Sequence, residues 1–238
     1  MKVVDNPVAL LNQQMRIILK RLNIFFSVFC VSITVGAQIT LRDVWLSMPD
    51  EMIPYLNKNL RLEHLDFVDM GVKSEVNNQM NGICLMDTLT DDYTHITLTP
   101  SSYLELRLLP VNDSTKIICV VKTLTVQAQE SDIRFYDIEW KPLIDTFGLN
   151  EMKNQDGNDA SKLKTSFIHR PDTMSIERFE ELSKLVDPVM LSAKFDLEEP
   201  VLTFALSPAL ATTEEKGQLK SILRHRRFKW NGNSFSEI

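Results

Sequence analysis

Between Tyr93 and Trp140 the chain alternates apolar and polar residues, and this pattern constrains the fold more than any other part of the sequence. One set of alternate positions in its clearest stretch is apolar: Leu104, Leu106 and Leu108. The positions between them hold Tyr103, Glu105 and Arg107. Side chains of a β-strand point alternately to its two faces, so the pattern predicts a strand with one face on a hydrophobic core and one in water.

Turn residues divide this region into several strands. We expect strands over residues 83–88, 93–99, 102–108, 115–126 and 133–140. The connections between them are short and contain Pro100, Pro110 or a polar run, all of which favour turns. A parallel crossover needs about a dozen residues, so short connections predict an antiparallel meander. The strand over 115–126 is rich in β-branched residues and is predicted to be covered on both faces.

Helical patterns precede this sheet and recur after it. We expect helices over 47–56 and 62–70, the first starting at Ser47 and the second ending at Gly71. The later part of the chain predicts helices over 175–186 and 212–223, strands over 189–195 and 201–206, and a hairpin over 227–235. The hairpin prediction depends on Asn231-Gly232, a strong signal for a tight turn.

These elements predict an α+β protein with two helix-then-antiparallel-sheet halves. We assign residues 38–149 to a helical lid plus an antiparallel meander sheet, 150–172 to an exposed linker, and 173–238 to a second, smaller α+β half. The similar order of elements in the two halves suggests a degenerate tandem repeat, with coincidence as the alternative.

The first 37 residues predict a secretory signal peptide. A basic region over 16–21 precedes an uncharged apolar run over 23–35, and small residues allow cleavage after Ala37. The run is shorter than the ~20 residues of a transmembrane helix, and an uncleaved anchor is the alternative. Met15 is an alternative start, because residues 1–14 make the region before the apolar run unusually long for a signal peptide. We expect an exported protein, periplasmic or extracellular, with no stable membrane span after cleavage.

The charge of the chain argues against a nucleic-acid partner. The formal net charge is −6, and the leader carries four basic residues and one acidic residue, so the mature chain reaches −9. Phosphate contacts need clustered Lys and Arg. Export would permit a disulfide between Cys84 and Cys119, but both lie among apolar residues of predicted strands, so buried thiols are an equal alternative.

No pattern in the sequence predicts a catalytic, cofactor-binding or metal site. The four histidines are far apart and lack the spacing of metal ligands: His64, His95, His169 and His225. The acidic run over 154–159 lacks the register of an EF-hand. Asp87, Asp91 and Asp92 crowd a turn, where Asp is ordinary.

One basic cluster interleaves aromatic residues near the C-terminus. Its members are Arg224, Arg226, Arg227, Lys229 and Trp230. The cluster would hold an anionic partner, such as an acidic glycan or a protein surface. The alternative is a helix C-terminus followed by an edge strand, whose charges prevent pairing with other chains.

Several stretches carry a resemblance to a known family. They are residues 39–50, 54–57, 61–67, 89–93, 135–136, 140–143 and 228–232. Together they resemble a family of uncharacterised exported proteins from Bacteroides-type bacteria. The resemblance implies an envelope or secreted location and a domain of unknown function, and it carries over no catalytic residue.

We therefore expect a non-catalytic binding or scaffolding protein of the bacterial cell envelope, with an envelope protein or glycan as partner. One alternative is an envelope hydrolase that uses carboxylates assembled by the fold. It would need titratable groups with perturbed pKa values that converge in a cleft. A second alternative is a carrier of a small apolar ligand, which would need a mostly apolar cavity. The residues that line the groove between the two predicted sheets distinguish these functions.

Overall fold

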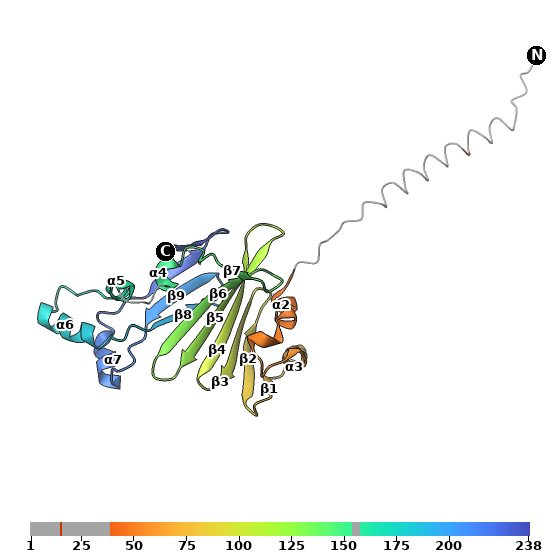
Figure 1. Ribbon diagram of the computed structural model, residues 1–238, viewed down its shortest axis with the longest axis horizontal. Helices are drawn as coiled ribbons and strands as arrows, with labels where there is room; N and C mark the ends of the chain where they lie inside the picture. Colours follow the sequence, from red (N-terminus) through yellow and green to blue (C-terminus); the bar gives the residue numbers. More distant parts are fainter. Residues whose placement is uncertain (1–14, 16–38, 154–157) are drawn as a thin grey trace, which may run out of the picture. The chain divides into compact units, whose positions relative to one another are not determined.

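The computed structural model describes Met15, residues 39–153 and residues 158–238 (Figure 1). The chain divides into two units, Met1–Gln38 and Ile39–Ile238, and all the elements below belong to the second. The predicted signal peptide lies outside the described residues, apart from Met15, so export stays a prediction. Among the described residues, no helix has both the length and the apolar character needed to cross a membrane.

Within the described residues, the strands form two antiparallel sheets, a large one of seven strands and a small one of four. The strands of the large sheet are β1 (Ser74–Asn77), β2 (Ile83–Leu89), β3 (Tyr93–Thr99), β4 (Ser102–Pro110), β5 (Lys116–Thr125), β6 (Gln129–Tyr136) and β7 (Pro142–Leu143). They lie side by side in chain order. The predicted meander is confirmed, and the structure adds β1 and β7 at its two edges.

Helices cover one face of the large sheet. They are α2 (Leu41–Ser47), the 3-10 helix η1 (Asp50–Met52) and α3 (Lys58–Asp69). Their apolar side chains form the helix-side core with Leu104, Leu106 and Leu108 of β4. The predicted class, α+β with antiparallel sheets, is therefore confirmed.

The prediction that a helix begins at Ser47 and continues to Leu56 is wrong. Helix α2 ends at Ser47, and Met48 takes an extended conformation (φ −58°, ψ 131°), because the residue before a proline is disfavoured in helical conformation. Only the short η1 follows Pro49. Helix α3 begins before the predicted helix over 62–70, and Asn57 caps it by accepting a hydrogen bond from the Leu60 backbone N–H at 3.1 Å.

The small sheet consists of β8 (Leu191–Phe195), β9 (Val201–Leu206), β10 (Arg226–Trp230) and β11 (Phe235–Glu237), in the order β11-β10-β9-β8. Helix α6 (Ile176–Lys184) precedes β8, and α7 (Thr213–Leu219) joins β9 to β10. The predicted hairpin is confirmed, but Trp230 pairs with Phe235, so four residues connect the strands instead of two. Gly232 takes φ +98° in this turn, a conformation that favours glycine.

The segment predicted as an exposed linker, 150–172, differs from that prediction. Its described part holds α4 (Asn150–Lys153) and α5 (Asn158–Phe167). Met152, Leu163 and Phe167 are buried in the hydrophobic core. Leu163 and Phe167 are four residues apart, the spacing that brings side chains to one face of a helix, and the polar composition around them obscured it.

The second face of the large sheet packs against the small sheet in the sheet-side core, which includes Cys119, Phe135, Phe195, Phe204 and Phe228. This core draws on both predicted halves, and Ile39–Ile238 forms one compact unit. The tandem repeat stays a prediction.

The polar face expected for the strand over 102–108 is buried instead of lying in water. Glu105 has 0% of its surface exposed and Arg107 has 1%. Strand β8 and the turn after it cover them, since Phe195 N donates to Glu105 Oε1 at 3.3 Å and Arg107 Nη1 donates to Asp196 O at 2.9 Å. The alternation in β4 reflects two buried faces, one of them polar.

Candidate functional site: a groove beside β6

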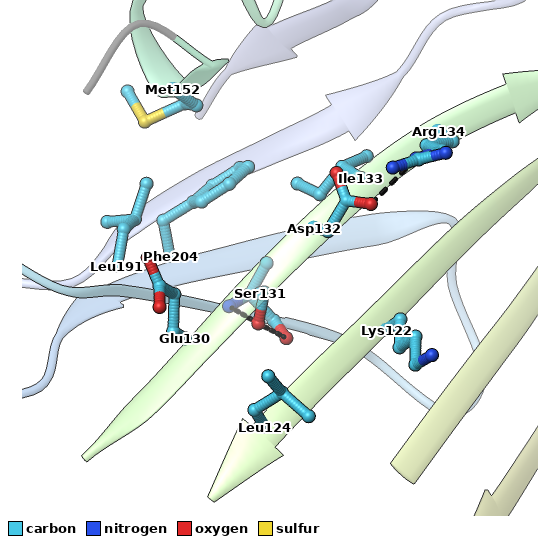
Figure 2. A pocket seen from close by; sticks show the side chains of 11 residues that line it. Lys122, Leu124, Glu130, Ser131, Asp132, Ile133, Arg134, Met152, Leu191 and Phe204 are labelled. Carbon is cyan, nitrogen blue, oxygen red and sulfur yellow. Dashed lines mark hydrogen bonds and ion pairs between the residues drawn. The ribbon is translucent and has the colours of Figure 1, made fainter. Parts of the chain in front are cut away.

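A cavity of about 690 Å³ lies along the outer edge of β6, between the two sheets. We name it the β6 groove, and its lining is Lys122, Leu124, Glu130, Ser131, Asp132, Ile133, Arg134, Met152, Leu191, Ala193 and Phe204 (Figure 2). Cavities of ~300–1,000 Å³ are the usual size of ligand sites. The groove is therefore the leading candidate for a binding site.

Charged side chains form the exposed wall of the groove. Glu130, Asp132 and Arg134 alternate along β6 and point to one face, since successive strand residues point to opposite faces. Asp132 accepts a hydrogen bond from Arg134 Nε at 2.7 Å, and this bond raises the pKa of the Arg134 guanidinium. Lys122 of β5 is directly opposite Asp132. Asp132 therefore lies between two cations.

Apolar side chains form the bottom of the groove. Leu191, Phe204 and Met152 lie on the side of β6 that faces away from β5 (Figure 2). They belong to the sheet-side core, and Phe204 has 0% of its surface exposed. The bottom is therefore a packed core surface. The apolar residue most accessible in the groove is Leu124, which is 50% exposed.

Ser131 joins the two sheets at the groove. Its Oγ accepts a hydrogen bond from Ala193 N at 2.8 Å and donates to Ala193 O at 3.4 Å. Ala193 lies on β8, whose second edge has no neighbouring strand among the described residues. Ser131 thus satisfies backbone groups of this edge and positions the small sheet below β6.

A smaller cavity of about 250 Å³ lies on the helix side of the large sheet. Apolar residues of η1 and the sheet line it, including Met52 and Leu104. Lys122, Asp132 and Arg134 line both cavities. The same charged side chains therefore border two adjoining hollows.

Three buried groups away from the groove have shifted pKa values. Burial, and then the charge of Glu105, raise the pKa of Tyr93, whose hydroxyl donates to Glu105 Oε1 at 2.7 Å. Burial raises the pKa of Glu105 in turn. Burial lowers the pKa of His64 to about 4. None of these three residues lines the groove.

One pair of side chains resembles an acid–base unit. His95 Nδ1 lies 2.9 Å from Asp87 Oδ2, which also accepts hydrogen bonds from Thr97 N and Thr97 Oγ1. Asp87 borders a hollow of about 400 Å³ beside β1 and β2, but His95 does not line it. The pair therefore does not converge on one cavity, as an active site requires.

The predicted basic cluster divides between the surface and the core. Trp230 is buried and donates from its indole to Pro110 O at 2.7 Å. Arg226 forms ion pairs with Glu237 and Glu151, and Lys229 with Glu199. Arg224 and Arg227 are exposed. Strand β10 lies between β9 and β11, so the edge-strand alternative is wrong, and an anionic partner stays a prediction.

Cys84 and Cys119 are buried thiols that form no disulfide with each other. They lie in different cores, Cys84 on the helix side and Cys119 on the sheet side. Among the described residues, no group of three or more His, Cys, Asp or Glu is placed to hold a metal ion.

The sequence interpretation missed the residues of the groove. Lys122 interrupts the apolar run over 115–126, and Glu130, Asp132 and Arg134 alternate, so each strand carried a local signal. No local signal places these charged residues near Leu191 or Phe204, because the two sets meet only when the small sheet packs against β6.

Comparison with known proteins identifies a family and a fold. A family model described as Protein of unknown function (DUF3256) matches residues 32–235. A solved structure, described as a domain of an uncharacterized protein from Porphyromonas gingivalis W83, has a TM-score of 0.61. It is 20% identical, and the match covers 83% of this chain and 97% of that one, so it shows the fold alone. No curated protein matches the chain.

Proposed function

Since the chain belongs to the DUF3256 family of proteins of unknown function, we propose from its geometry that it is a non-catalytic binding protein of the bacterial cell envelope. Its partner binds in the β6 groove. The observation that carries this proposal is the groove itself, a cavity of about 690 Å³ between the two sheets with an exposed charged wall. The leader pattern over 1–37 supports the envelope location.

The lining of the groove favours binding over hydrolysis. Its two carboxylates are Glu130 and Asp132, and Asp132 forms an ion pair with Arg134 in which both side chains are more than half exposed. Catalytic carboxylates need environments that separate their pKa values, usually through burial. The buried carboxylate of this fold, Glu105, bonds to Tyr93 and Phe195 and does not reach the groove.

The lining also argues against a carrier of apolar ligands. Such a site would present accessible apolar walls. Here Ile133, Leu191 and Phe204 are buried by the core, and charged side chains form the accessible wall. A partner would therefore gain little by burying apolar surface and would depend on polar contacts.

Site-specific photocrosslinking in intact cells tests this function. A photoreactive residue replaces Leu124 at the groove in one variant and Leu62 of α3 in the other. These positions are matched, since they are 50% and 47% exposed, and Leu62 does not line the groove. We expect a covalent adduct with an envelope component from position 124 and none from position 62. Equal adducts from both positions, no adduct, or a cytoplasmic location of the protein would contradict the proposal.

A further inference from the structure

We infer that the partner in the β6 groove is an extended peptide segment that adds to the free edge of β6 as another strand. The backbone of Ser131 and Ile133 would pair with it, and Glu130 would face a basic side chain. This inference rests on the proposed function and names the class of partner. It follows from the direction of the β6 backbone groups, the limits of β7 and the charges along the edge.

The hydrogen-bond pattern of β5 establishes which β6 residues direct their backbone N–H and C=O groups toward β5. Thr125 N donates to Ser101 O, so Thr125 directs its backbone groups toward β4. Residues of an antiparallel strand alternate in this direction, so Leu124 and Lys122 direct theirs toward β6. Their partners are Glu130 and Asp132. These two residues therefore use their backbone groups to bond β5.

The other β6 residues direct their backbone groups away from β5. Asp137 N donates to Lys141 O at 3.0 Å, beyond the end of the β6–β7 pairing. Gln129 N donates to Ser207 Oγ at 2.8 Å, again away from β5. Ser131 and Ile133 are an even number of residues from both Gln129 and Asp137, so their backbone groups point in the same direction. The backbone N–H and C=O groups of Ser131 and Ile133 therefore point into the groove.

Among the described residues, no strand pairs with this stretch of the edge, although Ala193 of β8 contacts the Ser131 side chain. Strand β7 pairs only with Phe135 and Tyr136, and Ser207 closes the other end at Gln129. Unpaired N–H and C=O groups on a sheet edge form a template for an added strand. At about 3.3 Å per residue, the edge between these limits fits a short extended segment.

The surroundings specify the chemistry of the segment. Residues opposite Ser131 and Ile133 would point to the apolar bottom formed by Leu191 and Phe204, and their neighbours would point to the charged wall. Asp132 is neutralised by Arg134, whereas Glu130 has no ion-pair partner within residues 39–153 and 158–238. Charge complementarity therefore favours Lys or Arg opposite Glu130. The segment would alternate apolar and polar residues and include a basic one.

A synthetic peptide tests the inference. The probe is a fluorescent peptide in which valines alternate with lysine and threonine, and its binding to the protein is measured by fluorescence anisotropy. A matched probe carries N-methyl groups on the alternate residues that would donate to β6, which keeps the side chains and removes the hydrogen bonds. We expect the methylated probe to bind about tenfold more weakly or worse, from the loss of two hydrogen bonds.

A charge exchange tests the contact with Glu130. We expect Glu130→Lys to lower the affinity for the lysine-containing probe about threefold to tenfold. Replacement of the probe lysine by glutamate should restore binding to that variant. Glu63→Lys is the control, the same charge change at an exposed residue of α3 outside the groove. An unchanged melting temperature would show that both variants fold.

Three outcomes would overturn strand addition: no binding of the probe, equal binding of the methylated probe, or self-association in which a second copy fills the groove. The crosslink from position 124 is independent of this probe. If the crosslink forms and strand addition fails, the groove still binds a partner, but of another chemistry. If neither is observed, the proposed function fails as well.

Discussion

At the scale of single residues, two buried titratable groups make the unfolding free energy depend on pH in opposite directions. Glu105 lies between the sheets with its Oε2 unpartnered within the described residues, and burial raises its pKa. His64 is a fully buried residue of α3. Its Nδ1 is 2.8 Å from Ser74 Oγ, and burial lowers its pKa to about 4. In both cases the folded protein favours the uncharged form.

Replacement of His64 should remove a loss of stability at acidic pH. The folded pKa lies below the unfolded value of 6.5, so the unfolded chain binds the proton first as pH falls. The wild-type protein should therefore lose about 3 kcal/mol of unfolding free energy between pH 7 and pH 4 through this group. Urea unfolding of His64→Gln at both pH values should lack this loss. The same loss in both proteins would show that His64 is not the group responsible.

Replacement of Glu105 should have the opposite pH dependence. Its raised pKa means that the stability contributed by the protonated form is present at low pH and is lost as pH rises through the folded pKa. Glu105→Gln retains an acceptor for Tyr93 and Phe195. We expect the unfolding free energy of this variant to increase relative to the wild type from pH 4 to pH 7. A relative decrease over that range would show that the buried carboxylate is stabilised as an anion.

At the scale of elements, Arg107 connects β4 to the turn that follows β8. Its guanidinium donates to the backbone carbonyls of Asp196, Leu197 and Glu198, and its charge lies over the Tyr93 ring. The carbonyls of this turn would otherwise lose these buried hydrogen bonds. Arg107 therefore holds the end of the small sheet on the large one.

Truncation of Arg107 should cost far more than loss of its ion-pair partner. We expect Arg107→Ala to lower the unfolding free energy by about 3 kcal/mol or more, because it breaks a buried polar network. Asp92→Asn removes only an ion pair whose carboxylate is 45% exposed and should cost less than about 1 kcal/mol. Chemical denaturation of both variants gives the comparison. Equal losses would mean that the salt bridge, and not the turn, makes Arg107 important.

The N-cap of α3 offers a second test at this scale. Asn57→Ala removes the acceptor for Leu60 N and should lower the unfolding free energy by about 1 kcal/mol. Asn59→Ala, within the first turn of the same helix, is the control and should have little effect. Equal effects on the melting temperature would contradict a capping role.

The elements also show what the sequence allowed us to predict. β-branched residues identified β5, and alternation identified β3, β4 and the second half of β6, because that pattern follows directly from strand geometry. It misassigned the polar face of β4, because polarity at Glu105 and Arg107 signals water in most strands, whereas here a second sheet satisfies both groups. Composition misassigned 150–172, because Leu163 and Phe167 are few among polar residues and yet anchor α5 in the core.

At the scale of the whole molecule, the candidate site is a product of tertiary packing. The groove forms where β6 continues beyond its pairing with β7 and the small sheet passes below it. Its lining spans Lys122 to Phe204, so no contiguous motif could have predicted it. The predicted basic cluster failed to assemble as a unit for the same reason, since β10 lies inside the small sheet and buries Trp230.

The most direct test of a free, partner-binding edge is the hydrogen-exchange rate of individual backbone amides along β6, measured by NMR. In the protein alone, we predict faster exchange for the Ser131 and Ile133 amides, which point into the groove, than for those of Asp132 and Arg134, which bond to β5. Addition of the probe peptide should slow Ser131 and Ile133 selectively. Slow exchange of these two amides in the protein alone, or no change on addition of the peptide, would contradict the free edge and its role in binding.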